Sequence, residues 1–170
     1  GYSNGAHHKN LHNYGAIEVT KEAKIIGVMA GGVGGCMYGT TENGSTDGCS
    51  NNATIKILGS TMENPKTGNY YYRVGGITGF GRHPFSNCVN NADGDILIEG
   101  NIVNVGLGSE RLTQISGVIA YKTNGPITNC DNYGDVTVNG NFTILSTDAN
   151  VIKGQPLSIG FKSGFLVEVL

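Results

Sequence analysis

Apolar and polar residues alternate in one short stretch that returns four times along this chain. The four copies are Ile17-Glu18-Val19, Ile55-Lys56-Ile57, Ile96-Leu97-Ile98 and Val136-Thr137-Val138. A period of two is typical of a β-strand with one buried face. We therefore expect the flanking aliphatic residues of every copy to point into a core and the middle residues to point outward.

Two other elements accompany each alternating stretch. One is an apolar, glycine-rich run, as in residues 74–80 and 115–121, and we assign residues 25–30 as an earlier copy. The other surrounds an Asn-Cys pair, as in residues 127–130, where the spacing departs from simple alternation and predicts a bend near Asn129. Each repeat is therefore expected to contain three short strands.

One residue in each copy of the Asn-Cys element marks the repeat. The marks are Leu11, Cys49, Cys88 and Cys130, at intervals of 38, 39 and 42 residues. A period in this range is typical of solenoids, propellers and other arrays, because one unit cannot bury its apolar face alone and must stack on the next. A position that accepts both Leu and Cys is expected to be a buried apolar site.

An asparagine follows each mark by two residues. These residues are Asn13, Asn51, Asn90 and Asn132. If the repeats stack in register, the four amides are expected to form a ladder in which each hydrogen-bonds the next. Two copies continue as Asn-Tyr-Gly, and because Gly and Asn tolerate a positive φ, this segment is predicted to be a corner of the chain.

These elements predict an all-β protein, a short parallel β-helix (β-solenoid) of triangular section with about four coils of three strands. Neighbouring coils would lie about 4.8 Å apart, which is the spacing of paired strands. Three long connections, residues 58–72, 99–113 and 139–156, are expected to open at the same corner. A propeller needs four strands in each blade and a β-trefoil has three units, so both fit the repeat less well.

The composition is compatible with one folded domain over residues 1–170. Apolar residues make up 38% of the chain and charged residues 14%, with a net charge of −2. Such a charge gives no electrostatic footprint for nucleic acid, and no apolar run approaches the ~20 residues of a membrane span. The chain starts within a repeat and without a signal segment, so we expect a fragment of a larger repeat protein, flanked by neighbouring repeats.

The cysteines are expected to be free, buried thiols rather than disulfides. Stacked, parallel side chains do not easily adopt the ~90° torsion of an S–S bond, although a disulfide between neighbouring coils stays possible at this stage. Cys36 falls outside the marks, in a segment we assign as an insertion over residues 31–47, and is the one thiol expected to be accessible. No Cys-x₂-Cys pair indicates a zinc site.

Metal, cofactor and phosphate sites are not indicated. His8 and His12 have the i, i+4 spacing of a helical metal site, but no helix is predicted here, and His7 adds nothing to that geometry. The run Gly31–Gly35 lacks the Lys and Ser or Thr of a P-loop and the Asp of a calcium-binding nonapeptide repeat, so we interpret it as a loop.

Catalytic residues are not indicated either. Asp95 and Asp135 occupy equivalent positions in neighbouring coils, where β-helical polysaccharide lyases can hold calcium, and Arg73, Arg82 and Arg111 are scattered around them. These residues form no evident acid–base set. We therefore expect a protein that is not an enzyme, with a polysaccharide-active lyase or hydrolase domain as the alternative.

The segment that best suits a binding site on the surface is Tyr70-Tyr71-Tyr72-Arg73. Rigid aromatic side chains with a polar tip suit the binding of sugars or protein partners. Arg82 and His83 follow in the next turn and are expected on the neighbouring corner of the same coil. The alternative is that Tyr70 and Tyr72 pack beneath their own loop.

The runs Gly75-Gly76-Ile77-Thr78-Gly79 and Asn129-Cys130…Gly134-Asp135-Val136 resemble the GLUG-type repeat of large secreted or surface-attached bacterial proteins, notably of gut Bacteroidetes. The resemblance covers nearly the whole chain. It implies an extracellular or cell-surface location and an adhesin-like or ligand-presenting role, with glycans or host proteins held by the corner loops. A purely structural spacer is a further hypothesis.

Overall fold

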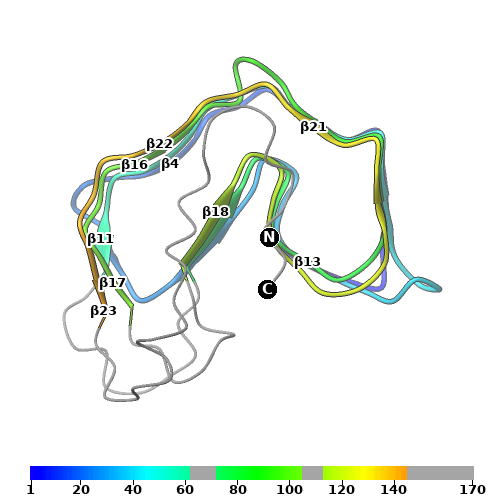
Figure 1. The fold of residues 1–170 in the computed structure, drawn as a ribbon, viewed down its shortest axis with the longest axis horizontal. Helices are drawn as coiled ribbons and strands as arrows, with labels where there is room; N and C mark the ends of the chain where they lie inside the picture. The colour runs from blue at the N-terminus through cyan, green and yellow to red at the C-terminus, as the bar shows by residue number, and fades with distance from the viewer. Residues whose placement is uncertain (62–71, 105–112, 145–170) are drawn as a thin grey trace.

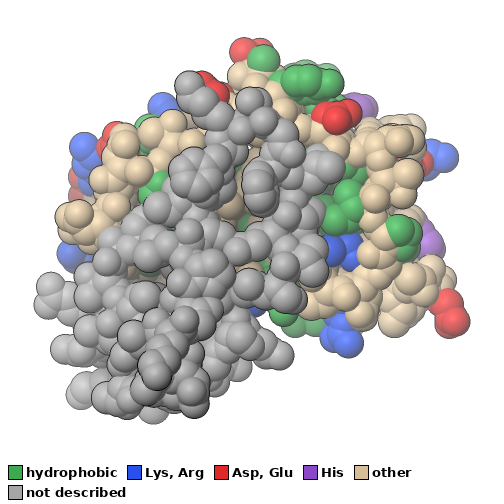
Figure 2. All heavy atoms as spheres, viewed as in Figure 1, with side chains coloured by type: hydrophobic (Ala, Val, Ile, Leu, Met, Phe, Trp, Pro, Cys, Tyr) green, Lys and Arg blue, Asp and Glu red, His purple; other side chains and the backbone are tan. Residues whose placement is uncertain are grey.

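The computed structural model describes residues 1–61, 72–104 and 113–144, and within these ranges the chain is all β-strand and connection, without helix. Short strands from successive coils stack into parallel columns (Figure 1). This confirms a short parallel β-helix. Charged side chains lie mostly around the outer rim of the visible end face (Figure 2).

One turn of the solenoid passes through six columns of stacked strands. The strands of each column are named in order from the first coil to the last. The first is β1 (Tyr2–Asn4), β7 (Gly34–Tyr38), β13 (Thr78–Gly81) and β19 (Ile119–Lys122). The second is β2 (His7–Lys9), β8 (Ser45–Asp47), β14 (Phe85–Ser86) and β20 (Ile127–Thr128). The third is β3 (His12–Asn13), β9 (Ser50–Asn51), β15 (Val89–Asn90) and β21 (Asp131–Asn132).

The remaining columns complete the turn. The fourth is β4 (Ile17–Val19), β10 (Ile55–Ile57), β16 (Ile96–Ile98) and β22 (Val136–Val138). The fifth consists of two pairs, β5 (Lys24–Ile25) with β11 (Ser60–Thr61), and β17 (Ile102–Asn104) with β23 (Phe142–Ile144). The sixth is β6 (Val28–Ala30), β12 (Tyr72–Gly75) and β18 (Thr113–Ser116).

Two of the three stretches predicted in a repeat are pairs of short strands with a bend between them, whereas the alternating stretch is a single strand, such as β16. In the third coil the glycine-rich run divides into β12 and β13, and the Asn-Cys element divides into β14 and β15. The bend in the Asn-Cys element lies at a residue with left-handed backbone conformation, because φ is positive at Asn10, Asn87 and Asn129 and at the equivalent Gly48. The bend expected near Asn129 is therefore present. The Asn-Tyr-Gly segments also bend, at Gly15 and Gly134, but without the positive φ that was expected there.

The interior holds two hydrophobic clusters, one enclosed mainly by the first three columns and the other by the last three. The first surrounds Phe85 and contains the three stacked cysteines, which are free and buried. The second is built from the aliphatic pairs of the fourth column with Tyr72 and Val74. Leu11, the first of the four marks, is 45% exposed in the end coil, so the buried site expected there is not observed.

A ladder of asparagine amides runs through the interior. Nδ2 of Asn13 donates to Oδ1 of Asn51 at 2.8 Å, Asn51 to Asn90 at 2.8 Å, and Asn90 to Asn132 at 2.7 Å. Each Nδ2 also donates to a backbone carbonyl in its own coil, that of Gly15, Ala53, Gly94 or Gly134. The buried amides thus have partners for their donors, which removes most of the cost of burying them.

Glycines opposite the ladder leave room for it. A Cβ at Gly76 would come within 2.5 Å of Cγ of Asn90, and Gly32 and Gly117 face Asn51 and Asn132 in the same way. The bend between β12 and β13 therefore approaches the ladder directly. This inward bend gives the coil a notched outline with two lobes (Figure 1), instead of the triangle that three straight strands would form.

Strand pairing corrects the assignment of the second coil. Ala30 pairs with Val74 and Gly34 with Thr78, so Gly31–Gly35 is a copy of the glycine-rich run and not an insertion. The extra residues of this coil are 39–44, between β7 and β8. The long connections do leave from one corner, between the fifth and sixth columns. Their central residues, 62–71 and 105–112, lie outside the described ranges, as does the third connection beyond residue 144.

Candidate functional site

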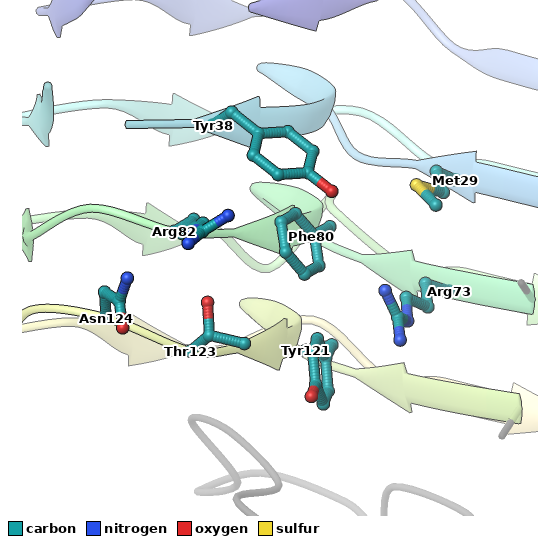
Figure 3. A pocket seen from close by; sticks show the side chains of 8 residues that line it. All are labelled: Met29, Tyr38, Arg73, Phe80, Arg82, Tyr121, Thr123 and Asn124. Carbon is teal, nitrogen blue, oxygen red and sulfur yellow. The ribbon is translucent and has the colours of Figure 1, made fainter. Parts of the chain in front are cut away.

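The notch between the first and sixth columns contains a cavity of about 290 Å³ (Figure 3). One wall comes from the first column and the residues that follow it, and the other from β6 and β12. The lining residues are Met29, Tyr38, Arg73, Phe80, Arg82, Tyr121, Thr123 and Asn124. We call this site the notch groove.

Aromatic rings form a column along one wall of the notch groove. Ring centroids are 5.6 Å apart for Tyr2 and Tyr38, 4.9 Å for Tyr38 and Phe80, and 5.5 Å for Phe80 and Tyr121. Phe80 and Tyr121 pair directly in register, whereas Tyr38 lies two residues beyond Cys36, the register partner of Phe80. Parallel stacking of coils about 4.8 Å apart places these rings at contact distance.

Arg73 reaches this ring column from the opposite wall. Its Cζ lies 4.0 Å from the ring centroid of Tyr121 and 5.2 Å from that of Phe80. Its Nε donates a 2.9 Å hydrogen bond to Oε1 of Gln114, its register partner on β18, and the residue is only 3% exposed. A desolvated guanidinium over an aromatic face gains on the order of 2 kcal/mol, so Arg73 is held firmly in place.

Arg82 stands at the rim of the notch groove. It is exposed, and its Cζ lies 5.7 Å from the ring centroid of Tyr38. With the Asn124 amide oriented for hydrogen bonding, its oxygen accepts from Nε of Arg82 at 3.3 Å. The cavity is therefore lined by one guanidinium group from each wall.

Of the predicted binding residues that the structure describes, Arg73 and Arg82 line the notch groove together. Tyr72 points the other way, into the second hydrophobic cluster, and burial raises the pKa of its hydroxyl. Alternation along β12 explains this result, since Tyr72 and Val74 face the core and Arg73 between them faces the notch. Tyr70 and Tyr71 lie outside the described residues.

His83 is also an interior residue and takes no part in the notch groove. It is fully buried, its ring lies 4.9 Å from that of Phe85, and its Nε2 lies 2.7 Å from Oγ1 of Thr46. Burial, aided by the nearby His8, lowers the pKa of His83 to about 4. The imidazole is therefore neutral at physiological pH and acts as a core residue.

Tyr38, Phe80 and Tyr121 were not among the site residues predicted from the sequence. Phe80 and Tyr121 occupy the same repeat position at the end of two copies of the glycine-rich run. This shared position could have indicated that their rings stack. The repeat spacing could not have indicated Tyr38, because this residue lies two residues away from the repeat position of Phe80 and Tyr121.

The other candidate residues do not converge. His7, His8 and His12 each lie 2.8–2.9 Å from a serine hydroxyl, those of Ser45, Ser3 and Ser50. No group of three or more His, Cys, Asp or Glu side chains placed to hold a metal ion occurs in the part of the chain that the structure describes. Oδ1 of Asp95 accepts from the backbone N–H of Asp135 at 2.8 Å, at an exposed corner.

Cys36 is buried, contrary to expectation, because it belongs to β7 and not to an insertion. Burial raises the pKa of its thiol. A buried thiol with a raised pKa is a poor nucleophile. The structure therefore offers no accessible cysteine among the four.

No known protein family, curated protein or solved structure matches this chain. Across the described ranges there is also no helix with the length and apolar character needed to cross a membrane.

Proposed function

We propose that this chain is a non-enzymatic β-helical scaffold that binds a saccharide polymer in the notch groove. The observation that carries the proposal is the ring column, in which Tyr38, Phe80 and Tyr121 come from three successive coils and line one cavity. Rigid rings provide contact area at a low cost in conformational entropy. The site differs from the corner loops considered in the sequence analysis.

Periodicity supports a saccharide over a peptide. Each coil contributes one ring to the same wall, from the same repeat position at Tyr2, Phe80 and Tyr121 and from two residues further along at Tyr38, and the centroids of neighbouring rings are 4.9–5.6 Å apart. A ligand built from identical units can make the same contact at every coil. A polysaccharide has this regularity, whereas the side chains of a peptide change from one residue to the next.

The composition of the notch groove supports binding rather than bond cleavage. None of its described lining residues is a carboxylic acid or a histidine, the groups that most often transfer protons in sugar hydrolysis. Thr123 and Asn124 instead contribute hydroxyl and amide groups, which hydrogen-bond sugar hydroxyls without reacting.

A screen of purified polysaccharides by isothermal titration calorimetry, followed by comparison of Tyr121→Leu with Tyr133→Leu, tests the proposal. Tyr133 lies in the same coil but is 64% exposed and does not line the groove. We expect Tyr121→Leu to weaken binding at least about tenfold, which corresponds to about 1.4 kcal/mol, and Tyr133→Leu to leave it unchanged.

Absence of binding to every polymer at millimolar concentration would exclude this function and favour the spacer hypothesis. Equal weakening by the two tyrosine variants would move the site away from the notch groove. A role at the bacterial cell surface, as the GLUG-type resemblance implies, is part of the same proposal and fits a scaffold that binds polymers outside the cell.

A further inference from the structure

We propose that the pair Asn124-Gly125, at the rim of the notch groove, is a site of spontaneous deamidation. Arg82 activates the side-chain amide of Asn124, and the backbone nitrogen of Gly125 attacks it. The product is an aspartate or isoaspartate at position 124, and water is the co-reactant. The modification places a new carboxylate beside Arg82, and it does not depend on the proposed function.

The reaction needs no group beyond this pair and water. The backbone nitrogen of Gly125 forms a bond to Cγ of Asn124 and releases its proton to the solvent. The C–N bond of the side-chain amide breaks, and its nitrogen takes up a proton and leaves as ammonia. Water then adds to one of the two carbonyl groups of the succinimide ring and opens it. Nothing is oxidised or reduced.

Two hydrogen bonds orient the Asn124 amide for this attack. With the amide oriented for hydrogen bonding, its Oδ1 accepts from Nε of Arg82 at 3.3 Å and its nitrogen donates to the Thr123 carbonyl at 3.0 Å (Figure 3). Attack at Cγ moves negative charge onto Oδ1. A cationic donor at this oxygen therefore stabilises the transition state more than the ground state.

Packing requires a glycine after Asn124. The φ angle of Gly125 is +77°, and a Cβ at this position would lie 2.7 Å from the backbone nitrogen of Pro84. A side chain at position 125, which would hinder the attacking nitrogen, is thus excluded by the fold. Gly125 is also exposed, so the solvent can accept the proton that its nitrogen releases.

Two other Asn-Gly pairs lack these conditions. The N–H of Gly5, which follows Asn4, donates to the Tyr38 carbonyl at 3.0 Å, so its nitrogen is already engaged. Gly44, which follows Asn43, is buried, and the solvent does not reach its nitrogen. These two pairs are expected to react more slowly than Asn124-Gly125.

The fourth Asn-Gly pair of the chain, Asn139-Gly140, provides an internal standard. It lies between β22 and β23, whereas Arg82 lies between β13 and β14. A change at Arg82 should therefore leave the rate at Asn139 unaltered. Any general effect of a variant on folding or on the buffer conditions would change the rates at both pairs.

The test is incubation of the folded chain in mildly alkaline buffer, followed by peptide mapping with mass spectrometry and an assay for isoaspartate. We expect Asn124 to be modified faster than Asn4 and Asn43. Arg82→Gln should slow the reaction at Asn124 about fivefold, less than the loss of a donor from a buried oxyanion hole, because Arg82 is exposed. Arg82→Lys, which keeps the charge, should retain part of the rate.

A faster reaction at Asn124 in Arg82→Gln would overturn the proposal, since it would show that Arg82 restrains the turn instead of activating the amide. An unchanged rate at Asn124, or an equal slowing at Asn124 and Asn139, would overturn it as well. None of these measurements uses a saccharide, so failure of the proposed function would leave them unaffected.

Discussion

Asn90 is the residue on which the interior depends most. It is fully buried, its Nδ2 donates to Oδ1 of Asn132 and to the Gly94 carbonyl, and its Oδ1 accepts from Asn51. Three hydrogen bonds at one side chain explain why an amide occupies a site surrounded by aliphatic residues. A carboxylate would lack the donors, and an aliphatic residue would leave three polar groups unpaired.

Replacing Asn90 by alanine is expected to lower the free energy of unfolding by about 3 kcal/mol, since each unpaired buried group costs roughly 1 kcal/mol or more. The matched control is Asn13→Ala in the end coil, which removes one link of the ladder at a half-exposed position and should cost about 1 kcal/mol. Urea denaturation followed by far-UV circular dichroism measures both values. Equal losses would show that the ladder has no cooperative role in the interior.

The bend between β12 and β13 is the element that shapes both the core and the notch groove. Glycine at position 76 lets the backbone approach Asn90, and this approach turns the outer faces of the two strands toward each other. Arg73 on β12 and Phe80 on β13 then line the same cavity. One glycine position therefore links core packing to the candidate site.

Gly76→Ala is expected to destabilise the protein by about 3 kcal/mol or more, because the new Cβ would overlap Asn90 and the Gly117 carbonyl. Gly15→Ala is the control, since the nearest atom to a Cβ there is Oδ1 of Asn13 at 3.9 Å. Thermal unfolding of the two variants makes the comparison. A mild effect at Gly76 would mean that β12 and β13 can separate from the ladder without loss.

Sequence periodicity predicted the elements well and their bends poorly. Stacking repeats the same buried positions in every coil, so the alternating pairs and the asparagine spacing are detected by comparing the repeats. The direction of the bend at Gly76 depends on a contact with Asn90, fourteen residues away in the sequence, which spacing alone does not reveal. The insertion at residues 39–44 shifted the spacing of the second coil and hid the copy of the glycine-rich run at Gly31–Gly35.

At the scale of the whole molecule, each coil is stabilised by its neighbours rather than by contacts within itself. The fourth column shows this dependence, because the aliphatic residues of β10 and β16 are buried while those of the outer strands β4 and β22 are only half-buried. In repeat proteins the terminal units have one neighbour fewer and open more easily.

Hydrogen exchange followed by mass spectrometry should therefore show the slowest amide exchange in β10 and β16 and faster exchange in β4 and β22. The comparison is made within one column, where all four strands are three residues long and differ in having one or two neighbouring strands. Uniform exchange over the four strands would indicate that the coils open together as one unit.

The asparagine ladder also gives the solenoid a chemical direction. Every link donates from an amide nitrogen to the oxygen of the following coil, so the ladder offers the oxygen of Asn13 at one end and the nitrogen of Asn132 at the other. A further coil added next to Asn13 must bring an N–H group, and one added next to Asn132 must bring a carbonyl. Two copies can therefore extend each other only head to tail, because like ends would set oxygen against oxygen or donor against donor.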